Sequence, residues 1–530
     1  MSREQQRAEL HRTIWKIAND LRGSVDGWDF KQYVLGFLFY RFISENITNY
    51  LNEKTRKAIG DNSFNYAKLS DEMAENARQS TTEEKGFYIL PSELFENVWA
   101  KAKNNQNLNE TLERVFKHIE GSAMGFDSEN DLKGLFDDVD VNSNKLGATV
   151  TKRNELLVKL FDAIGGLNLG NFQDNSIDAF GDAYEFLMTM YASNAGKSGG
   201  EFYTPQEVAE LLAKITLVGK TEVNKVYDPA CGSGSLLLKF AKILGKENVR
   251  QGFFGQEINI TTYNLCRINM FLHDINFEKF NIAHGDTLID PAHWDFEPFE
   301  AIVSNPPYSK TWAGDENPLL INDPRFSPAG VLAPKSKADL AFTMHILSWL
   351  ATNGTAAIVE FPGVLYRSGA EQKIRKYLID NNYIDCVIQL PANLFFGVSI
   401  ATCIIVLKKS KTDNATLFID ASKESVHSGN KEKLTDENIE KILNAYINRH
   451  CGLDSQSPDY RHFTRLVPNA DIAANDYNIA VSSYVEQEDT REVVDIVELN
   501  AKIAEIVKRE DELRKAIDKI IADLEGGSDE

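Results

Sequence analysis

The sequence has few cysteines, no long apolar run and no secretory signal. Its five cysteines form no Cys-x-x-Cys pair, which predicts neither a disulfide framework nor a structural zinc site. The polar N-terminus lacks the apolar core of a signal peptide, and the most apolar early run, residues 33–43, is too short to cross a bilayer. We therefore expect a cytoplasmic protein with a buried helix at residues 33–43, no metal site and no membrane contact.

Positive charge is also scarce. Lysine and arginine number 57 against 78 aspartates and glutamates, which gives a net charge of −21 over 530 residues. Contacts to phosphates supply most of the non-specific affinity of proteins for DNA, so this chain does not offer a broad basic surface by itself. If its substrate is DNA, another component must help to hold it.

The chain divides into three regions by pattern. Residues 1–165 show helical spacing without strand signals, which predicts an N-terminal helical domain with a helix N-cap at Asp29. Residues 166–484 alternate short β-branched runs with amphipathic stretches, which predicts a parallel, doubly wound α/β sheet. Residues 485–530 carry a heptad pattern, which predicts a helix that either packs on a partner helix or on its own domain.

The predicted strands are residues 223–227, 252–258, 299–304, 355–361, 384–390 and 400–407. The apolar positions of the C-terminal heptads are Ile496, Leu499, Ile503, Ile506, Leu513, Ile517, Ile520 and Leu524. Ligands of doubly wound sheets bind at the carboxyl ends of the strands, so we expect the functional residues there.

A glycine-rich turn, Asp228-Pro-Ala-Cys-Gly-Ser-Gly, follows the first predicted strand. Glycine lets the backbone approach a ligand closely. A dinucleotide-binding turn would need a third glycine where Leu237 stands, and the carboxylate of Asp228 would repel a pyrophosphate. A ligand with a positively charged aminoacyl end, such as S-adenosylmethionine, fits this turn better, although any α/β protein can use such a turn as a tight connection.

Carboxylates also follow the next strands. Glu257 ends the second predicted strand, where an acid can accept hydrogen bonds from both ribose hydroxyls of a nucleoside; a solvated strand end is the alternative. Asp286 lies in His284-Gly-Asp-Thr-Leu and can accept from an adenine amino group or serve as a turn aspartate.

The sequence Asn305-Pro306-Pro307-Tyr308 directly follows an apolar strand. Two prolines cannot extend a central strand, so they lock a turn that directs the Asn305 side chain outward. An exocyclic or amide nitrogen is a poor nucleophile because its lone pair is delocalised. If the Asn305 side-chain oxygen and the Pro306 carbonyl accept its protons, the nitrogen can pyramidalise and attack a sulfonium methyl. The Tyr308 ring can stack a base, which is worth ~1 to 3 kcal/mol.

This ordered set of motifs resembles the S-adenosylmethionine-dependent adenine-N6 DNA methyltransferases. Upstream, Gly199-Gly-Glu-Phe-Tyr-Thr-Pro matches the motif that precedes the glycine turn in that family and packs on the methionine end of the cofactor. The helical region (RGSVDGWDFKQYVLG, LFYRFISENI) and the acidic C-terminal helix resemble the modification (HsdM) subunit of type I restriction-modification systems. The resemblance implies a Rossmann-like methyltransferase sheet with an N-terminal helical domain and a C-terminal helix.

The family also implies function and partners. It implies N6 methylation of a flipped-out adenine in a split sequence of double-stranded DNA, with S-adenosylmethionine as cofactor. Two such subunits would bind one specificity subunit, and a restriction subunit would join for cleavage. The implied cofactor contacts are Glu201, Phe202, Tyr203, Thr204, Pro205, Gln206, Asp228, Gly232, Ser233, Gly234, Ser235, Glu257 and Asp286. The implied catalytic turn is Asn305, Pro306, Pro307 and Tyr308. Phe395 or Phe396 would pack on the flipped base, although paired aromatics after a strand are more often core residues.

Two other functions stay open at this point. A protein glutamine N5-methyltransferase can use the same turn on an amide nitrogen, but it has no obvious need for the large helical domain and the terminal heptads. A non-catalytic, cofactor-binding assembly subunit would show an impaired turn, and both the turn and the cofactor loop are complete here.

Overall fold

The computed structural model describes most of the chain, in two compact units. The described residues are 8–15, 27–169, 179–194, 204–294, 297–314, 317–395, 399–429, 431–448, 462–486 and 496–525. The first unit comprises Met1–Val485 and the second Glu486–Glu530. The proposed boundary between a helical and a methyltransferase domain at residue 165 lies within the first unit and stays a prediction.

The N-terminal region is helical. Its longest helix, α2 (Gly27–Ile59), carries the apolar run from Tyr33 to Ile43, whose hydrophobic side chains are buried as predicted. Asp29 lies inside α2, so the N-cap prediction is wrong. Residues 8–15 are also helical. The remaining helices of this region are α3 (Asp71–Ala74), α4 (Arg78–Lys85), α5 (Phe95–Ala102), α6 (Leu108–Gly121), α7 (Glu129–Leu132), α8 (Val150–Gly165) and α9 (Ala179–Asn194).

A nine-stranded sheet forms the rest of the first unit, in the order β11-β8-β6-β7-β5-β4-β1-β2-β3. Its strands are β1 (Val226–Asp228), β2 (Phe253–Glu257), β3 (Phe280–His284), β4 (Phe299–Ser304), β5 (Leu350–Glu360), β6 (Ile384–Gln389), β7 (Cys403–Lys408), β8 (Ala415–Asp420) and β11 (Thr464–Pro468). A separate hairpin pairs β9 (Val426–Ser428) with β10 (Lys431–Lys433). The six predicted strands correspond to β1, β2, β4, β5, β6 and β7, whereas β3, β8 and β11 were not predicted.

The expectation of a wholly parallel sheet is wrong. Strands β3, β2, β1, β4 and β5 are parallel neighbours, but β7 runs antiparallel to both β5 and β6, and β11 runs antiparallel to β8. A parallel neighbour needs a crossover of a dozen or more residues, usually a helix. The described residues between β6 and β7 contain no helix, so the chain returns antiparallel.

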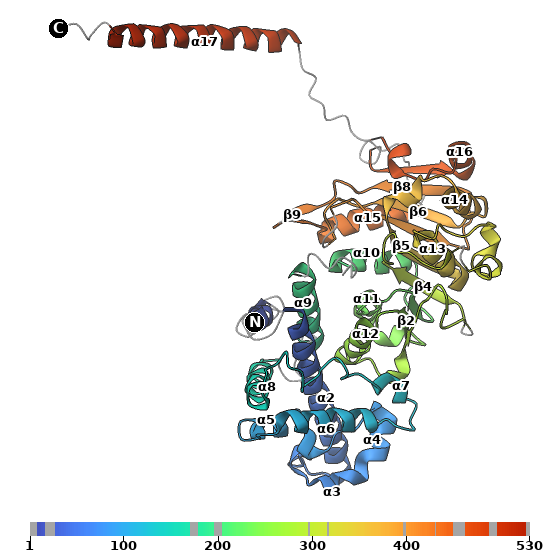
Figure 1. Cartoon of the computed structure of the whole chain (residues 1–530). Helices are drawn as coiled ribbons and strands as arrows, with labels where there is room; N and C mark the ends of the chain where they lie inside the picture. Colours follow the sequence, from blue (N-terminus) through green and yellow to red (C-terminus); the bar gives the residue numbers. More distant parts are fainter. Residues whose placement is uncertain are drawn as a thin grey trace. The chain divides into compact units, whose positions relative to one another are not determined.

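Helices cover both faces of the sheet, and the strand residues alternate between two cores. Val226 and Val303 face a core shared with α10, α11, α12 and the N-terminal helices, whereas Tyr227, Ile302 and Ile358 face a second core with α13 and α14. Helix α12 contacts β2 and β3 on one side and α2 and α9 on the other (Figure 1). These helices are α10 (Gln206–Thr216), α11 (Ser235–Leu244), α12 (Ile260–Leu272), α13 (Asp339–Trp349), α14 (Ala370–Asp380), α15 (Asp436–Asn448) and α16 (Asn469–Ala474).

Arg267 ties α12 to the N-terminal helices. Its buried guanidinium donates through Nη1 to the carbonyl oxygens of Asn130, Asp131 and Lys133, at 2.9, 3.1 and 3.0 Å. These carbonyls lie in or just after α7, where a helix leaves its last carbonyl groups without intrahelical donors. One arginine therefore satisfies three backbone acceptors and holds the helical region against the sheet.

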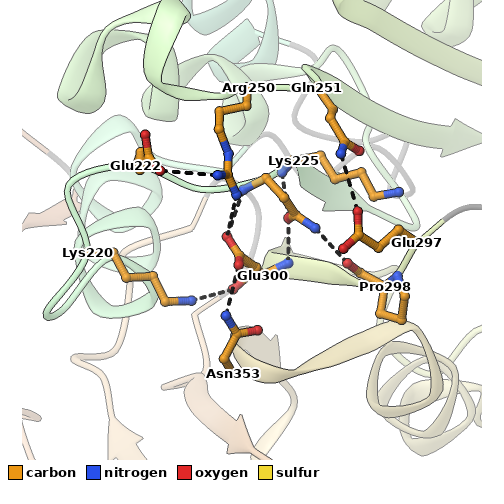
Figure 2. Close-up of polar contacts among 10 residues, drawn as sticks. Lys220, Glu222, Lys225, Arg250, Gln251, Glu297, Pro298, Glu300 and Asn353 are labelled. Atoms are coloured by element: carbon orange, nitrogen blue, oxygen red, sulfur yellow. Dashed lines mark hydrogen bonds and ion pairs between the residues drawn. The ribbon is translucent and has the colours of Figure 1, made fainter.

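A polar network connects the amino ends of three strands (Figure 2). The Asn224 side chain donates to the carbonyl of Pro298 at 2.9 Å and accepts from the backbone N–H of Glu300 at 3.0 Å. The Glu300 carboxylate accepts from the backbone N–H of Asn224 at 2.7 Å and from the side chain of Asn353 at 2.8 Å. Lys220 adds a bond of 2.9 Å to the Glu300 carbonyl. The network fixes where β1, β4 and β5 stand relative to one another, and thereby aligns their opposite, carboxyl ends.

The second unit contains the predicted C-terminal helix, α17 (Ile496–Glu525). The heptad residues whose side chains are described are 45 to 64% exposed along its length: Leu499, Ile503, Ile506, Leu513, Ile517 and Ile520. Among the residues that the structure describes, no helix is long and apolar enough to cross a membrane.

Candidate active site

The carboxyl ends of the parallel strands bring the sequence-predicted residues to one edge of the sheet. In the register of β1 and β2, Asp228 lies opposite Gly255, so Glu257 extends two residues further at the same edge. In the register of β1 and β4, Tyr227 lies opposite Ile302, which places Asn305 just beyond the same edge. Residues separated by about 80 positions in the sequence therefore become neighbours.

The glycine turn combines close packing with an open face. Gly232 and Gly234 have left-handed φ values of +54° and +80°. A Cβ atom at Gly234 would lie 2.8 Å from Sγ of Cys266 and 2.9 Å from Cε of Met270, whereas a Cβ at Gly232 would meet nothing within 4 Å. Gly234 thus packs the turn on α12, and Gly232 leaves its backbone open to a ligand before α11 begins at Ser235.

Glu257 holds this turn in place. One carboxylate oxygen accepts from the backbone N–H of Gly232 at 3.0 Å and the other from the N–H of Asn259 at 2.8 Å. The side chain is half-buried, so Glu257 is more than a solvated strand end. Each carboxylate oxygen can accept more than one hydrogen bond, so these contacts leave room for ribose hydroxyls.

Asp228 is fully buried beneath the turn. Its Oδ1 accepts from the backbone N–H of Ala230 at 3.0 Å and from the Ser304 hydroxyl at 2.8 Å. Its Oδ2 has no hydrogen-bond partner among the described residues. Burial raises the pKa of Asp228 to about 7; the Ala230 and Ser304 bonds oppose this shift, and the charge of Glu257 adds to it. An orphaned carboxyl oxygen fits a positively charged donor such as the aminoacyl end of S-adenosylmethionine.

The Asn305 amide is held at both ends. Its Nδ2 donates to Oγ1 of Thr204 at 3.0 Å, and its Oδ1 accepts from the Tyr308 hydroxyl at 2.6 Å. Burial raises the pKa of the Tyr308 hydroxyl well above its usual range, with the charge of Glu360 adding to the shift, so the hydroxyl stays a donor.

The turn itself is rigid. After Pro306 and Pro307, Ser309 adopts a left-handed φ of +51°, and its backbone N–H donates to Oδ1 of the buried Asp339 at 3.1 Å. The Tyr308 ring is half-buried against the neighbouring core.

The other residues that were predicted to contact the cofactor lie at the start of α10, in the glycine turn and in the loop after β3. Pro205 stands at the N-cap of α10 and Gln206 opens that helix. The hydroxyls of Ser233 and Ser235 lie 3.1 Å apart. Asp286 accepts from the backbone N–H of Leu288 at 2.9 Å, the geometry of a turn aspartate.

The two aromatic residues that were predicted to pack on the flipped base lie in different parts of the chain. Phe395 is 2% exposed and belongs to the hydrophobic core, the alternative that the sequence left open for this pair. Phe396, together with Glu201, Phe202 and Tyr203, lies outside the described residues.

Two contacts were missed by sequence reasoning. Ser304 bonds Asp228, and Asp339 anchors the Asn305 turn. The position of Ser304 at the end of an apolar strand was a usable signal for that residue. Asp339 lies in a distant segment and gave none.

The described residues show no arrangement for metal binding. No group of three or more histidine, cysteine, aspartate or glutamate side chains is placed to hold a metal within the described ranges. The described cysteines, Cys231, Cys266, Cys386 and Cys403, are buried.

The sheet, the glycine turn and the strand-end carboxylates define an α/β protein of the Rossmann-like methyltransferase class. Residues 175–493 match the family described as N-6 DNA Methylase, and residues 10–164 match the HsdM N-terminal domain. The chain therefore belongs to the N-6 DNA methylase family, with the type I restriction enzyme methylase subunits.

Known proteins are similar over nearly the whole chain. The type I restriction enzyme MpnII methylase subunit of Mycoplasma pneumoniae is 48% identical over 98% of this chain and 97% of its own length. The type I restriction-modification system methyltransferase subunit of Streptococcus thermophilus has a solved structure that matches with a TM-score of 0.80 and 36% identity, over 91% of this chain and 100% of that chain. A chain from a structure of a type I R-M system shares the fold, with a TM-score of 0.63, 19% identity and coverage of 98% and 99%.

Proposed function

We propose that this chain is a modification subunit that transfers a methyl group from S-adenosylmethionine to N6 of adenine in double-stranded DNA. A separate specificity subunit supplies the target sequence. The observation that carries the proposal is the Asn305 amide, fixed at the carboxyl end of β4 beside the open glycine turn. An acceptor oxygen at this position suits an amino-group substrate.

The cofactor would supply an electrophilic methyl group. Asp228 suits its aminoacyl ammonium group, because a buried carboxyl oxygen there has no donor among the described residues. Glu257 suits the ribose hydroxyls and Asp286 the adenine amino group. The open backbone at Gly232, together with Ser233 to Ser235 and the segment 201–206, completes the proposed cofactor contacts.

The residues of the turn act on the target nitrogen. Oδ1 of Asn305 and the carbonyl of Pro306 would accept hydrogen bonds from its two N–H groups and direct its lone pair toward the methyl group; on transfer the nitrogen loses one proton to water and S-adenosylhomocysteine leaves. The Tyr308 ring stacks the base, and Phe396 provides a second apolar contact. Because these groups act on a base edge that lies inside a duplex, the adenine must first be flipped out.

The two competing functions are not favoured. A glutamine methyltransferase does not account for the HsdM N-terminal domain, which matches residues 10–164. A non-catalytic subunit does not account for an intact Asn305 turn with both amide ends held.

The partners follow from charge and from the C-terminal helix. A net charge of −21 disfavours DNA binding by this chain alone. The exposed seam of α17 suits a helix of the specificity subunit. We expect two modification subunits for each specificity subunit, a restriction subunit in the cleavage complex and a cytoplasmic location.

The test is an Asn305→Ala variant of the full chain, assembled with its specificity subunit. We expect methyl transfer to DNA to be abolished, because the target nitrogen loses an acceptor. Calorimetry should show affinity for S-adenosylmethionine within about twofold of wild type, since Glu257 and the glycine turn are unchanged. Asn281→Ala, at an exposed position of β3, is the matched control and should retain activity. Full methylation by Asn305→Ala would contradict the proposed site.

A further inference from the structure

We infer that Arg325 is a positioning residue that fixes the loop after β3 so that Asp286 can recognise the adenine of the cofactor. Arg325 lies in the segment between the catalytic turn and α13, far from β3 in the sequence. The inference deepens the proposed function and rests on it, because the contact between Asp286 and the adenine amino group belongs to that proposal.

Arg325 bonds the backbone of the two residues that directly follow Asp286. Its Nη1 donates to the carbonyl of Thr287 and its Nη2 to the carbonyl of Leu288, both at 2.8 Å. All three residues are buried, so both carbonyls would lose a buried donor without the guanidinium, which is costly. The backbone N–H of Leu288 donates to Oδ1 of Asp286 at 2.9 Å. A shift of Leu288 would therefore move the Asp286 carboxylate with it.

The guanidinium itself is held in one orientation. The Asp323 carboxylate accepts from Nε at 3.0 Å and from Nη2 at 2.7 Å, which is a bidentate pair. Nη1 lies 3.2 Å from Nδ1 of His345. Burial lowers the pKa of His345 well below its usual range, with the charge of Arg325 adding to the shift, so the ring is neutral. Because a guanidinium only donates, Nδ1 accepts and Nε2 carries the proton, which Nε2 donates to the Tyr227 hydroxyl in β1 at 2.9 Å.

The same loop is bonded to two other parts of the proposed cofactor site. The Thr287 hydroxyl donates to the carbonyl of Pro229, in the glycine turn, at 2.5 Å. The backbone N–H of Gly285 donates to the carbonyl of Glu257 at 3.0 Å. Arg325 completes this set of bonds from the side of α13, and the position of the loop relative to the glycine turn then follows from all of them.

A positioning role and a merely structural role predict different binding. A structural residue, when replaced, lowers the stability of the fold or weakens all ligands of the site alike. Displacement of Asp286 changes the preference between two ligands that differ only at the adenine amino group. S-adenosylhomocysteine carries this amino group, whereas S-inosylhomocysteine carries an oxo group in its place, which a carboxylate opposes. The ratio of their dissociation constants therefore measures whether the carboxylate is in position.

The experiment is isothermal titration calorimetry of the full chain with each of the two ligands. The wild type should prefer S-adenosylhomocysteine by at least about tenfold, as expected for a hydrogen bond to a charged group. Arg325→Lys keeps the buried charge but lacks the planar fork, so the preference should fall to about threefold or less. Asp323→Asn keeps Arg325 and removes one of its two carboxylate acceptors, so the preference should fall by about threefold.

A matched control is Arg375→Lys, at a buried arginine in α14. Arg375 also donates to two backbone carbonyls, those of Tyr477 and Val364, both at 2.8 Å. Its replacement should lower the midpoint of thermal unfolding, as Arg325→Lys does, and leave the wild-type preference between the ligands. A loss of stability alone therefore does not imitate the predicted result.

The inference is overturned if Arg325→Lys keeps the wild-type preference, or if Arg375→Lys loses it to the same extent. Should Arg325→Lys fail to fold, Asp323→Asn decides, and an unchanged preference in that variant overturns the inference. Asp286→Ala tests the proposed function separately, because it removes the carboxylate itself and should abolish the preference. An unchanged preference in Asp286→Ala, or no preference in the wild type, would contradict the adenine contact of the proposed function, so the two failures are distinguishable.

Discussion

Asp228 is the residue whose charge state links the site to pH. Burial raises its pKa to about 7, so the carboxyl is mostly neutral below that pH and mostly ionised above it. Only the ionised form attracts a cationic ammonium group. Binding of an aminoacyl cation should therefore strengthen as pH rises through neutrality.

We predict that the affinity of the full chain for S-adenosylmethionine rises about fivefold between about pH 6 and about pH 7.5, where the cofactor's α-amino group stays mostly protonated. Isothermal titration calorimetry across this range measures the effect. Asp228→Asn cannot ionise, so its affinity should vary little with pH. A flat profile for the wild type, or the same rise in Asp228→Asn, would show that Asp228 does not meet the cationic group.

At the residue scale, the sequence predicts which residues form the site but not which of them contact one another. Asp228, Glu257 and Asn305 follow predicted strands, and the rule that parallel strands end at one edge places them together. The bond from Asn305 to Thr204 spans 101 residues of sequence, and the bond from Ser304 to Asp228 spans 76. No local pattern specifies such pairs, because they depend on the packing of α10 and on the register of β1 and β4.

At the scale of elements, α17 carries an exposed apolar seam. We predict that replacing Ile503, Ile506, Leu513 and Ile517 together with glutamate releases the specificity subunit, because four charges would have to be buried in the seam. A pull-down with the specificity subunit measures complex formation. Glutamate is a good helix former, so α17 itself should persist.

The control for this variant places glutamate at Ala501, Ala504 and Ala522, which the helical spacing puts on the opposite face of α17. This control should still bind the specificity subunit. Both variants should bind S-adenosylmethionine as the wild type does, since the substitutions leave the first unit unchanged. Complete assembly by the seam variant would rule out the seam as the docking surface.

Strand existence was easier to predict than strand direction. The strands β4 and β6 are buried at five of their six positions and stand out in the sequence, whereas β3 mixes buried and exposed positions over five residues and gives a weak signal. Direction depends on the connections: β7 is as apolar as a parallel strand, but it runs antiparallel to both neighbours. Periodicity reports which residues are buried, and it does not report which way a strand runs.

At the scale of the whole molecule, the net charge limits binding to DNA, and contacts between regions hold the first unit together. The net charge of −21 opposes autonomous DNA binding. Within the first unit, Arg267 bonds the helical region to the sheet, which makes the two regions parts of one compact body. The composition of the sequence predicted that the chain needs a partner to bind DNA. The attachment of the helical region to the sheet was not predicted, because it depends on contacts between α12 and residues more than 130 positions earlier.

The central claim is that this chain carries the methyl-transfer site and obtains its DNA target from a partner. The most direct measurement is mass spectrometry of nucleosides, with sequence mapping, after a plasmid carrying a randomised insert reacts with S-adenosylmethionine. We predict N6-methyladenine at one split sequence when the chain is assembled with its specificity subunit, and none from the purified chain alone. Sequence-specific N6-methyladenine from the purified chain alone, or no methylated adenine from the assembled complex, would contradict this account.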